Sequence, residues 1–351
     1  MQTLNIFTNK PDSLPQGKAD FLLAASVTRT CEIDGISQAG IPGKIPLTPT
    51  LDAEFMATQK VFSLTEIPET SNGVPSPVII TRAVGNLTGY SSMEVLNLGL
   101  DVIPQNTPLK NFEIEPSDSV ASGANIDAKA VFEKGMIAGK NYELKGNYLI
   151  LAECVPSGTT TAATTALALG YDCRGDFSSS FLNAPDSIKE KTIDAALALV
   201  KKDMSNFEKL SLVSDNMLIF CAGFLLEATK RFHVVLAGGT QMASCLLVAD
   251  ALREDVLMRV KSDNITLATT SWVANDEKSD IKHILSLLSY TPHAVHTSFS
   301  FADAEIPVLK LYDDGEAKEG VGAGAALAYA KTNGATNKEI LDAVELIIYS
   351  M

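Results

Sequence analysis

A turn rich in small, hydroxyl-bearing residues is the segment of this sequence best suited to bind an anion. Residues 153–170, ECVPSGTTTAATTALALG, place a glutamate before a Pro-Ser-Gly turn, and threonines open the apolar stretch that follows. If a strand precedes this turn and a helix follows it, unpaired N–H groups and the helix dipole favour a phosphate or carboxylate there. The alternative is that a hydroxyl of the turn only caps the helix. The candidate anion-binding residues are Ser157, Gly158, Thr159 and Thr160.

A second segment repeats this plan. Residues 234–252, VVLAGGTQMASCLLVADAL, again read as a strand, a glycine turn, a threonine and a helix, with Gly238 and Gly239 at the corner. Neither segment has the Gly-Lys-Ser/Thr ending of a phosphate-binding loop, and neither contains G-x-G-x-x-G. The sequence therefore favours a small anionic ligand over a nucleoside triphosphate or a dinucleotide.

A third candidate combines a carboxylate with a glycine-rich backbone. In KEGVGAGAALAYA, residues 318–330, Glu319 precedes the alternate glycines Gly320, Gly322 and Gly324. Such a backbone could lie against a flat ligand while the glutamate reaches it. The alternative is a flexible turn with a solvated glutamate.

Histidine and cysteine give no sign of a metal or a cofactor. The chain has four histidines, and His293 and His296 fall three apart in an expected strand, which points them to opposite faces. Its five cysteines are scattered and form no C-x-x-C pair. This pattern predicts neither a zinc site nor a disulfide framework and fits a reducing compartment. We expect no metal and no cofactor.

Charge and hydropathy exclude two classes of partner. The formal net charge is −14 at pH 7, so there is no basic stripe to neutralise a nucleic-acid backbone. The longest apolar run, residues 217–226, is too short for a membrane span, and the first residues lack the apolar core of a signal peptide. We therefore expect a cytoplasmic protein that binds neither nucleic acid nor membrane.

The elements that must position these motifs read as an α/β fold. Short runs rich in Leu, Val and Ile predict buried strands, and helical patterns lie between them. This alternation predicts a Rossmann-like, mostly parallel sheet flanked by helices, with sites at the carboxyl ends of the strands. The expected strands are Phe21–Ala25, Val78–Thr81, Tyr148–Ala152, Val234–Ala237, Ile265–Thr269 and Ala294–Thr297.

Taken together, AECVPSGTTTAATTALALGYD, NAPDSIKEKTIDAAL, HVVLAGGTQMAS and EGVGAGAALAYA resemble, in order and spacing, the nicotinate-nucleotide:dimethylbenzimidazole phosphoribosyltransferase (CobT) family, in a divergent branch. The resemblance implies a core of residues 19–310 that binds nucleotide and base. It also implies a smaller helical subdomain from the chain ends, residues 1–18 with 311–351, which completes the active site. Family members usually form homodimers.

The resemblance also implies a reaction. The family moves phosphoribose from nicotinate mononucleotide to an azole base and releases nicotinate, which assembles the lower ligand of cobalamin-type cofactors. Nicotinate leaves from a pyridinium without a general acid, whereas the attacking azole must lose a proton, so one carboxylate suffices as general base. The acceptor could be a benzimidazole or a purine such as adenine.

Family positions can be carried over residue by residue. Glu319 matches the general base, although Val321 stands where classical members have the acid, so Glu319 lies two residues early. Glu153 matches a glutamate beside the nucleotide and is the second catalytic candidate. Lys191 matches a lysine near the phosphate, and its alternative is a solvated helix residue. The remaining substrate-binding candidates are Ser157, Gly158, Thr159, Thr160, Gly238, Gly239, Gly320 and Gly322.

Two other functions stay open at this point. One is a related ribosyl transfer such as nucleoside phosphorolysis, which would consume a free nucleoside instead of the mononucleotide. The other is a non-catalytic sensor that keeps the phosphate-binding turn, and the shifted position of Glu319 favours it. A sensor would bind nucleotide tightly without turnover.

Overall fold

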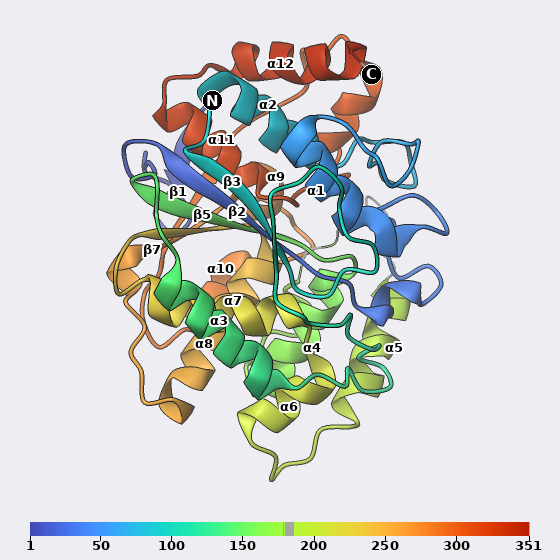
Figure 1. Cartoon of the computed structure of the whole chain (residues 1–351), viewed down its shortest axis with the longest axis vertical. Helices are drawn as coiled ribbons and strands as arrows, with labels where there is room; N and C mark the ends of the chain where they lie inside the picture. The colour runs from blue at the N-terminus through green and yellow to red at the C-terminus, as the bar shows by residue number, and fades with distance from the viewer. Residues whose placement is uncertain (178, 180–185, 351) are drawn as a thin grey trace.

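The computed structural model describes residues 1–177, 179 and 186–350, and within them the chain forms a three-layer α/β/α sandwich (Figure 1). Asn183, Ala184 and Pro185, which open the NAPDSIKEKTIDAAL motif, lie outside the described residues. One mixed sheet separates two layers of helices. Its order is β1-β8-β7-β6-β5-β2-β3-β4, and only the edge pair β1 and β8 is antiparallel. The expected Rossmann-like fold is confirmed.

The direction of the strand order reverses at the centre of the sheet. From β2 the chain moves outward through β3 to β4, then returns to β5 on the other side of β2 and continues to β8. The crevice at such a reversal, at the carboxyl ends of the strands, is where open α/β sheets bind ligands. The strands are β1 (Thr3–Asn5), β2 (Ala19–Ala25), β3 (Ser92–Asn97), β4 (Leu109–Asn111), β5 (Tyr148–Cys154), β6 (Val234–Ala237), β7 (Ile265–Thr270) and β8 (His293–Thr297).

Both faces of the sheet are covered, which explains why its central strands read as continuous apolar runs. Alternate residues of β5 contribute to two separate cores: Leu149 and Leu151 to one, Ile150 and Ala152 to the other. The helices over one face are α1 (Thr48–Thr58), α2 (Val78–Thr88), α11 (Ala323–Thr332) and α12 (Asn337–Tyr349). Those on the other side are α3 (Ala128–Asn141), α4 (Gly158–Ala168), α5 (Asp186–Leu197), α6 (Asn206–Val213), α7 (Asn216–Ala228), α8 (Thr240–Asp255) and α10 (Ile281–Ser286). The short helix α9 (Ser271–Ala274) follows β7 directly.

One expected strand is wrong. Val78–Thr81 forms the first turn of α2, which begins after Pro77 and ends at Gly89, a glycine with a positive φ of 67°. Three apolar residues and a threonine cannot distinguish a strand from a buried helical turn, and here the apolar pattern continues at helical spacing. The other five expected strands are confirmed, whereas the short strands β1, β3 and β4 were not expected from the sequence.

The two ends of the chain contribute to different parts of the molecule. Residues 1–18 supply the edge strand β1, and the last residues supply α11 and α12, which pack against α2. α12 begins with a capping box in which Thr336 and Glu339 exchange hydrogen bonds. The division into a core of residues 19–310 and a chain-end subdomain stays a prediction.

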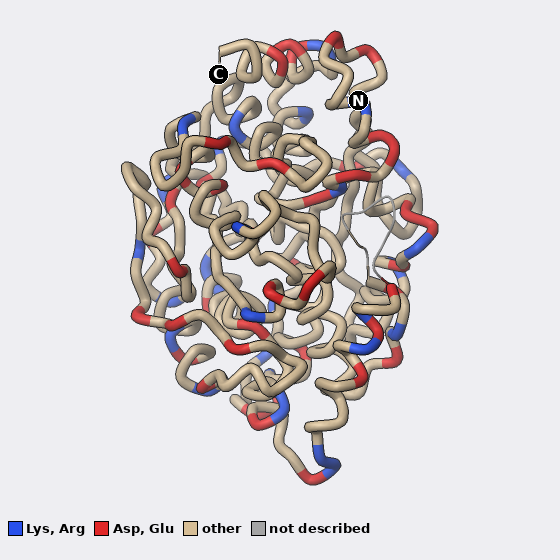
Figure 2. Tube along the Cα trace, turned by 90° about the vertical axis from the view of Figure 1, so that its right-hand side faces the viewer, with Lys and Arg blue, Asp and Glu red and all other residues tan. Residues whose placement is uncertain are grey.

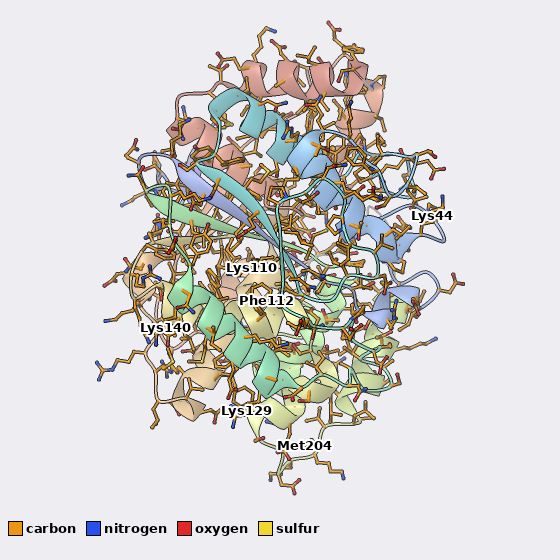
Figure 3. The ribbon with its side chains drawn as sticks, viewed as in Figure 1. Lys44, Lys110, Phe112, Lys129, Lys140 and Met204 are labelled. Atoms are coloured by element: carbon orange, nitrogen blue, oxygen red, sulfur yellow. The ribbon has the colours of Figure 1, made fainter. Side chains whose placement is uncertain are left out.

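Charged residues are dispersed over the surface. In Figure 2 basic residues are scattered among the acidic ones along the trace and do not gather in a stripe on the face shown, within the described residues. Lys129 and Lys140 project from α3, while Lys44 lies on the opposite side of the view (Figure 3). None of the described helices is both long and apolar enough to cross a membrane.

Candidate active site

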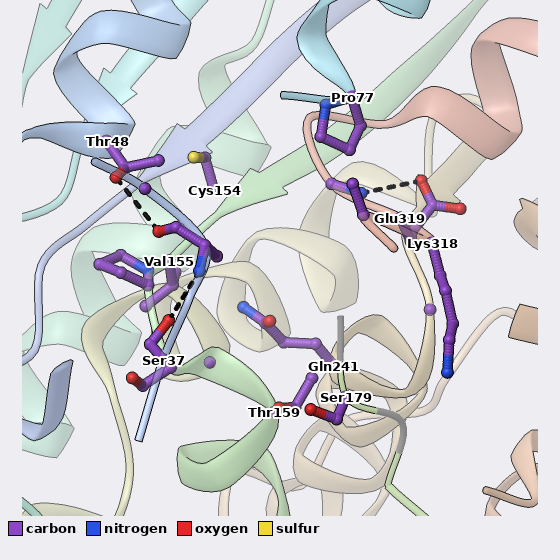
Figure 4. A pocket seen from close by; sticks show the side chains of 18 of the residues that line it. Ser37, Thr48, Pro77, Cys154, Val155, Thr159, Ser179, Gln241, Lys318 and Glu319 are labelled. Atoms are coloured by element: carbon purple, nitrogen blue, oxygen red, sulfur yellow. Dashed lines mark hydrogen bonds between the residues drawn. The ribbon is translucent and has the colours of Figure 1, made fainter. Parts of the chain in front are cut away.

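A pocket opens at the carboxyl ends of the strands, beside the reversal between β2 and β5 (Figure 4). It encloses about 1070 Å³ of empty space, which includes open solvent. Its walls come from segments far apart in the sequence. These include residues 36–40, 76–77, 153–160, 239–241 and 317–321.

The turn between β5 and α4 forms the floor of this pocket. Ser157 is the N-cap of α4 and adopts a left-handed conformation with φ 62° and ψ 15°, which is uncommon for a residue with a side chain. Its hydroxyl is buried and has no hydrogen-bond partner in the described structure. The next residue, Gly158, lies so close to Gln241 that an added Cβ would be 2.3 Å from the amide group. The turn therefore brings a helix N-terminus and an unpaired hydroxyl into the pocket.

Lys189, on α5, reaches the floor of the pocket. Its ammonium donates to the hydroxyl of Thr159 at 3.4 Å and to the carbonyl of Phe177 at 3.3 Å. Burial lowers the pKa of Lys189 to about 8, although nearby carboxylates act to raise this pKa. Lys191, the lysine indicated by the family resemblance, is exposed on the same helix and does not line the pocket. Residues two apart on a helix face different directions, so only one of the two can point inward.

Glu319 occupies the opposite wall, held by backbone and side-chain donors. Its Oε2 accepts hydrogen bonds from the Thr269 hydroxyl at 3.1 Å and from the Thr270 N–H at 2.9 Å. Its Oε1 accepts from the N–H groups of Gly320 at 3.2 Å and Gly324 at 3.0 Å. The surrounding protein desolvates the carboxyl and raises the pKa of Glu319 to about 7, although these hydrogen bonds favour the ionised form.

Glu153 lies near the end of β5 and is 6% exposed. Burial raises the pKa of Glu153 to about 8, with further contributions from the charges of Glu319 and Asp215. The Val155 N–H is the donor that lowers it. Of the two glutamates, Glu319 has the better-stabilised negative charge. The pair can therefore hold one proton near neutral pH, with the ionised carboxylate on Glu319.

The alternate glycines let the turn after Glu319 lie directly on the strands. Gly322, the N-cap of α11, has a positive φ of 73°, and a Cβ there would approach Ala152 to 2.8 Å. At Gly324 a Cβ would fall 2.1 Å from the backbone of Thr269. Side chains at these positions would push α11 and Glu319 off the end of β7. The glycines are therefore required by close backbone packing.

Further polar groups face the same space. Lys318 and Asp276 form a buried ion pair at 2.8 Å, and Lys318 lines the pocket next to Glu319. Asp52 on α1 and Gln241 on α8 each have a buried polar atom, Oδ1 and Nε2 respectively, without a hydrogen-bond partner in the described structure. Buried polar atoms are nearly always paired in folded proteins, so unpaired ones in a pocket are candidates for pairing with a ligand or with water.

Most of the residues singled out in the sequence come together here. Gly238 and Gly322 lie behind the pocket wall, against the side chains of Glu153 and Ala152 respectively. Sequence reasoning missed Lys189, Lys318, Asp52 and Gln241, of which all but Asp52 lie within a quoted motif. The candidates that line the pocket are Glu153, Ser157, Gly158, Thr159, Thr160, Gly239, Glu319 and Gly320.

Comparison with known proteins gives two kinds of match. The chain is 32% identical over 348 residues to a UPF0284 protein of Sulfurisphaera tokodaii, covering 98% of this chain and 97% of that protein. It is 34% identical over 309 residues to a UPF0284 protein of Methanocaldococcus jannaschii, covering 87% and 86%. It is 35% identical over 344 residues to one of Halobacterium salinarum, covering 95% and 97%. No protein-family profile matches the sequence.

Among solved structures, the chain resembles CobT from Thermus thermophilus with a TM-score of 0.60 and 17% identity, covering 97% of this chain and 85% of that one. A structure of the nicotinate-nucleotide-dimethylbenzimidazole phosphoribosyltransferase from the same organism gives a TM-score of 0.59 and 16% identity, covering 97% and 84%. At this identity the similarity shows a shared fold. The family resemblance read from the sequence motifs is thereby confirmed at the level of the fold.

Proposed function

The chain belongs to the UPF0284 family, and we propose that it is a phosphoribosyltransferase that moves phosphoribose from nicotinate mononucleotide to a benzimidazole or purine base. The observation that carries this proposal is one pocket with two chemically distinct ends. A helix N-terminus with hydroxyl groups and Lys189 forms one end, and Glu319 and Glu153 lie at the other. A phosphate monoester and a proton-releasing azole are the groups that these two ends would hold.

The phosphate of the mononucleotide would rest on the floor of the pocket. There the N-terminus of α4 favours negative charge, and Ser157 and Thr159 can donate hydroxyl hydrogen bonds to it. Lys189 supplies the positive charge that an otherwise acidic chain needs at this point, since its ammonium already contacts the Thr159 hydroxyl. The ribose would then extend toward Glu153 and Glu319.

In the reaction, a ring nitrogen of the azole attacks C1 of the ribose, and the bond from C1 to the pyridinium nitrogen breaks. Nicotinate keeps that electron pair and leaves without needing a proton. The azole gains positive charge, and its second ring N–H transfers a proton to the Glu319 carboxylate. Glu319 suits this role because its four donors hold the carboxylate in place and favour its ionised form. Glu153, which has the higher pKa, can donate a hydrogen bond to a ribose hydroxyl.

The test is nicotinate release from nicotinate mononucleotide, measured with and without a panel of benzimidazoles and adenine. Base-dependent release that falls at least about a hundredfold in Glu319→Gln would support the proposal. The side-chain amide introduced by Glu319→Gln would face N–H donors. The thermal stability and the mononucleotide affinity of this variant must therefore be measured alongside its activity. Glu277→Gln, on an exposed residue, is the matched control. Tight binding of the mononucleotide without release with any base would contradict the proposal and favour a sensor.

A further inference from the structure

Two carboxyl groups that line the pocket, Asp52 and Glu69, have no role in the proposed reaction, and of these Asp52 is the buried one. Asp52 lies on α1, is 2% exposed, and lines the wall of the pocket that the N-terminal part of the chain provides. Its Oδ2 accepts a hydrogen bond from the Cys154 thiol at 3.2 Å. Within the described residues its Oδ1 makes no hydrogen bond of normal length, although the Ser76 hydroxyl lies near enough to the carboxyl to lower its pKa, against burial, which raises it. A buried carboxyl oxygen without a partner is costly unless something else provides a donor.

A second carboxyl on the same helix shows that the fold can satisfy such a group. Glu54, two residues further along α1, is also buried, yet both its oxygens are paired. Its Oε2 accepts from the N–H groups of Phe62 at 2.7 Å and Ser63 at 3.0 Å. Its Oε1 accepts from the Ser63 hydroxyl at 2.6 Å and the Gln105 N–H at 2.8 Å. Glu54 is a structural group, whereas Asp52 has an oxygen left over on the pocket side of the helix.

The position of Asp52 within the pocket indicates what could pair with it. Figure 4 shows Thr159 and Ser179 at one end of the pocket, where the phosphate is proposed to bind. Cys154, the hydrogen-bond partner of Asp52, lies at the opposite end, across the pocket from Pro77 and Glu319. A ligand anchored by its phosphate therefore has its base end, not its phosphate, near Asp52.

We propose that Asp52 Oδ1 accepts a hydrogen bond from an amino or hydroxyl group on the six-membered ring of the acceptor base. The pocket would therefore prefer azoles that carry such a donor over azoles that carry methyl groups there. This inference rests on the proposed phosphoribosyl transfer and names its substrate class. A methylated ring would cover Oδ1 without pairing it, and sites with a buried unpaired polar group discriminate strongly against such ligands. Asp52 is thus a specificity-determining residue, and Glu319 remains the base.

The experiment uses pairs of bases that differ only at the relevant substituent. Adenine is compared with purine, and 5-hydroxybenzimidazole with 5-methylbenzimidazole, by kcat/KM for nicotinate release. In the wild-type protein we expect the donor-bearing member of at least one pair to be favoured about tenfold or more. The pair that shows the preference distinguishes a purine from a benzimidazole acceptor.

Two variants assign the preference to the carboxyl. Asp52→Leu has a similar volume and removes both oxygens, and it should bring the ratio within each pair close to one. Asp52→Asn, which keeps one carbonyl oxygen, should retain part of the preference. The KM for nicotinate mononucleotide should change less than about twofold in either. Asp303→Asn, on an exposed residue, is the matched control for a lost carboxylate.

Several outcomes would overturn the inference while leaving the proposed function intact. One is release with ratios near one in the wild type, and another is a preference that survives in Asp52→Leu. A third is an equal fall in kcat/KM for all bases in Asp52→Leu, together with a raised KM for the mononucleotide. That result would place Asp52 at the ribose. If no base gives release in the wild type, the proposed function fails. Calorimetric binding of the same base pairs to wild type and Asp52→Leu then still tests the preference, because it needs no turnover.

Discussion

The Val321 N–H donates a 3.0 Å hydrogen bond to the carbonyl oxygen of Glu153, which joins the end of β5 to the turn that carries Glu319. Val321 also accepts a 2.8 Å hydrogen bond from the Thr81 hydroxyl through its own carbonyl. Val321, which stands where the family resemblance expects the acid, therefore ties the turn that carries Glu319 to β5 and to α2. Both glutamates line one pocket as a result.

The first prediction concerns the pH dependence of turnover. If Glu319 is the base, it must be ionised, and burial raises the pKa of Glu319 to about 7. With mononucleotide limiting, kcat/KM should therefore rise with pH through about 7 and fall again above about 8, where Lys189 loses the charge proposed to bind the phosphate. The pH profile should be measured with an acceptor base that does not itself titrate in this range. A rise that persists in Glu319→Gln but disappears in Glu153→Gln would assign the base to Glu153 instead.

The second prediction concerns stability. Burial raises the pKa of Glu153 to about 8, so the folded protein binds a proton there more tightly than the unfolded chain, whose pKa is near 4.5. This stabilisation is fully present at low pH and is lost as pH rises through about 8. The free energy of unfolding of Glu153→Gln, relative to wild type, should therefore increase by on the order of a few kcal/mol between mildly acidic pH and pH 8.

Denaturant unfolding of both proteins across this pH range measures the difference. Glu277→Gln, which removes an exposed carboxylate, should follow the wild-type curve. Asp52, Asp215 and Glu319 are buried, also have a raised pKa, and act on Glu153 through their charges, so the difference between the two proteins measures Glu153 together with its coupling to these groups. Parallel curves for wild type and Glu153→Gln would show that this glutamate titrates normally.

The third prediction separates the two lysines of α5. Lys189 contacts the hydroxyl of Thr159 in the pocket, whereas Lys191 is exposed. Lys189→Met should weaken the binding of nicotinate mononucleotide by about tenfold or more, because a charge-assisted contact to phosphate is lost. Lys191→Met should leave the affinity within about twofold. Calorimetry with nicotinate riboside, which lacks the phosphate, should show no difference between wild type and Lys189→Met.

The proposed phosphate position would be contradicted if Lys191→Met, and not Lys189→Met, weakened the binding of the mononucleotide. It would also be contradicted if Lys189→Met weakened the binding of the riboside as much as that of the mononucleotide. Burial lowers the pKa of Lys189 to about 8, so removing its charge relieves a desolvation cost, and the variant should remain folded.

The sequence predicted the central sheet and the anion-binding turn because both rest on local signals. Glu153 through Thr160 lie on one strand, one turn and one helix, and each of these can be recognised from its own residues. The prediction at Val78–Thr81 failed because such a short, mostly apolar run fits either a strand or a helix, and tertiary contacts decide between them.

The missed residues of the site depend on non-local contacts. Asp52 matters because α1 places it against Cys154 and leaves one oxygen unpaired, and no pattern around LTPTLDAEF reveals that. The choice between Lys189 and Lys191 depends on the rotation of α5 about its axis. Helical spacing distinguishes the two faces of α5, but it does not say which face meets the pocket.

The last prediction concerns the glycines that carry Glu319. A Cβ at Gly324 would fall 2.1 Å from the backbone of Thr269, which cannot move without shifting β7. Gly324→Ala should therefore lower the free energy of unfolding by about 2 kcal/mol or more, and it should also displace the N–H that binds Glu319. Gly334→Ala is the control, because nothing lies within 4 Å of its Cβ and only its left-handed backbone is strained, which costs about 1 kcal/mol. Urea unfolding and nicotinate release measure both effects. If Gly324→Ala were as stable and active as Gly334→Ala, close contact between α11 and β7 would not be what positions the carboxylate.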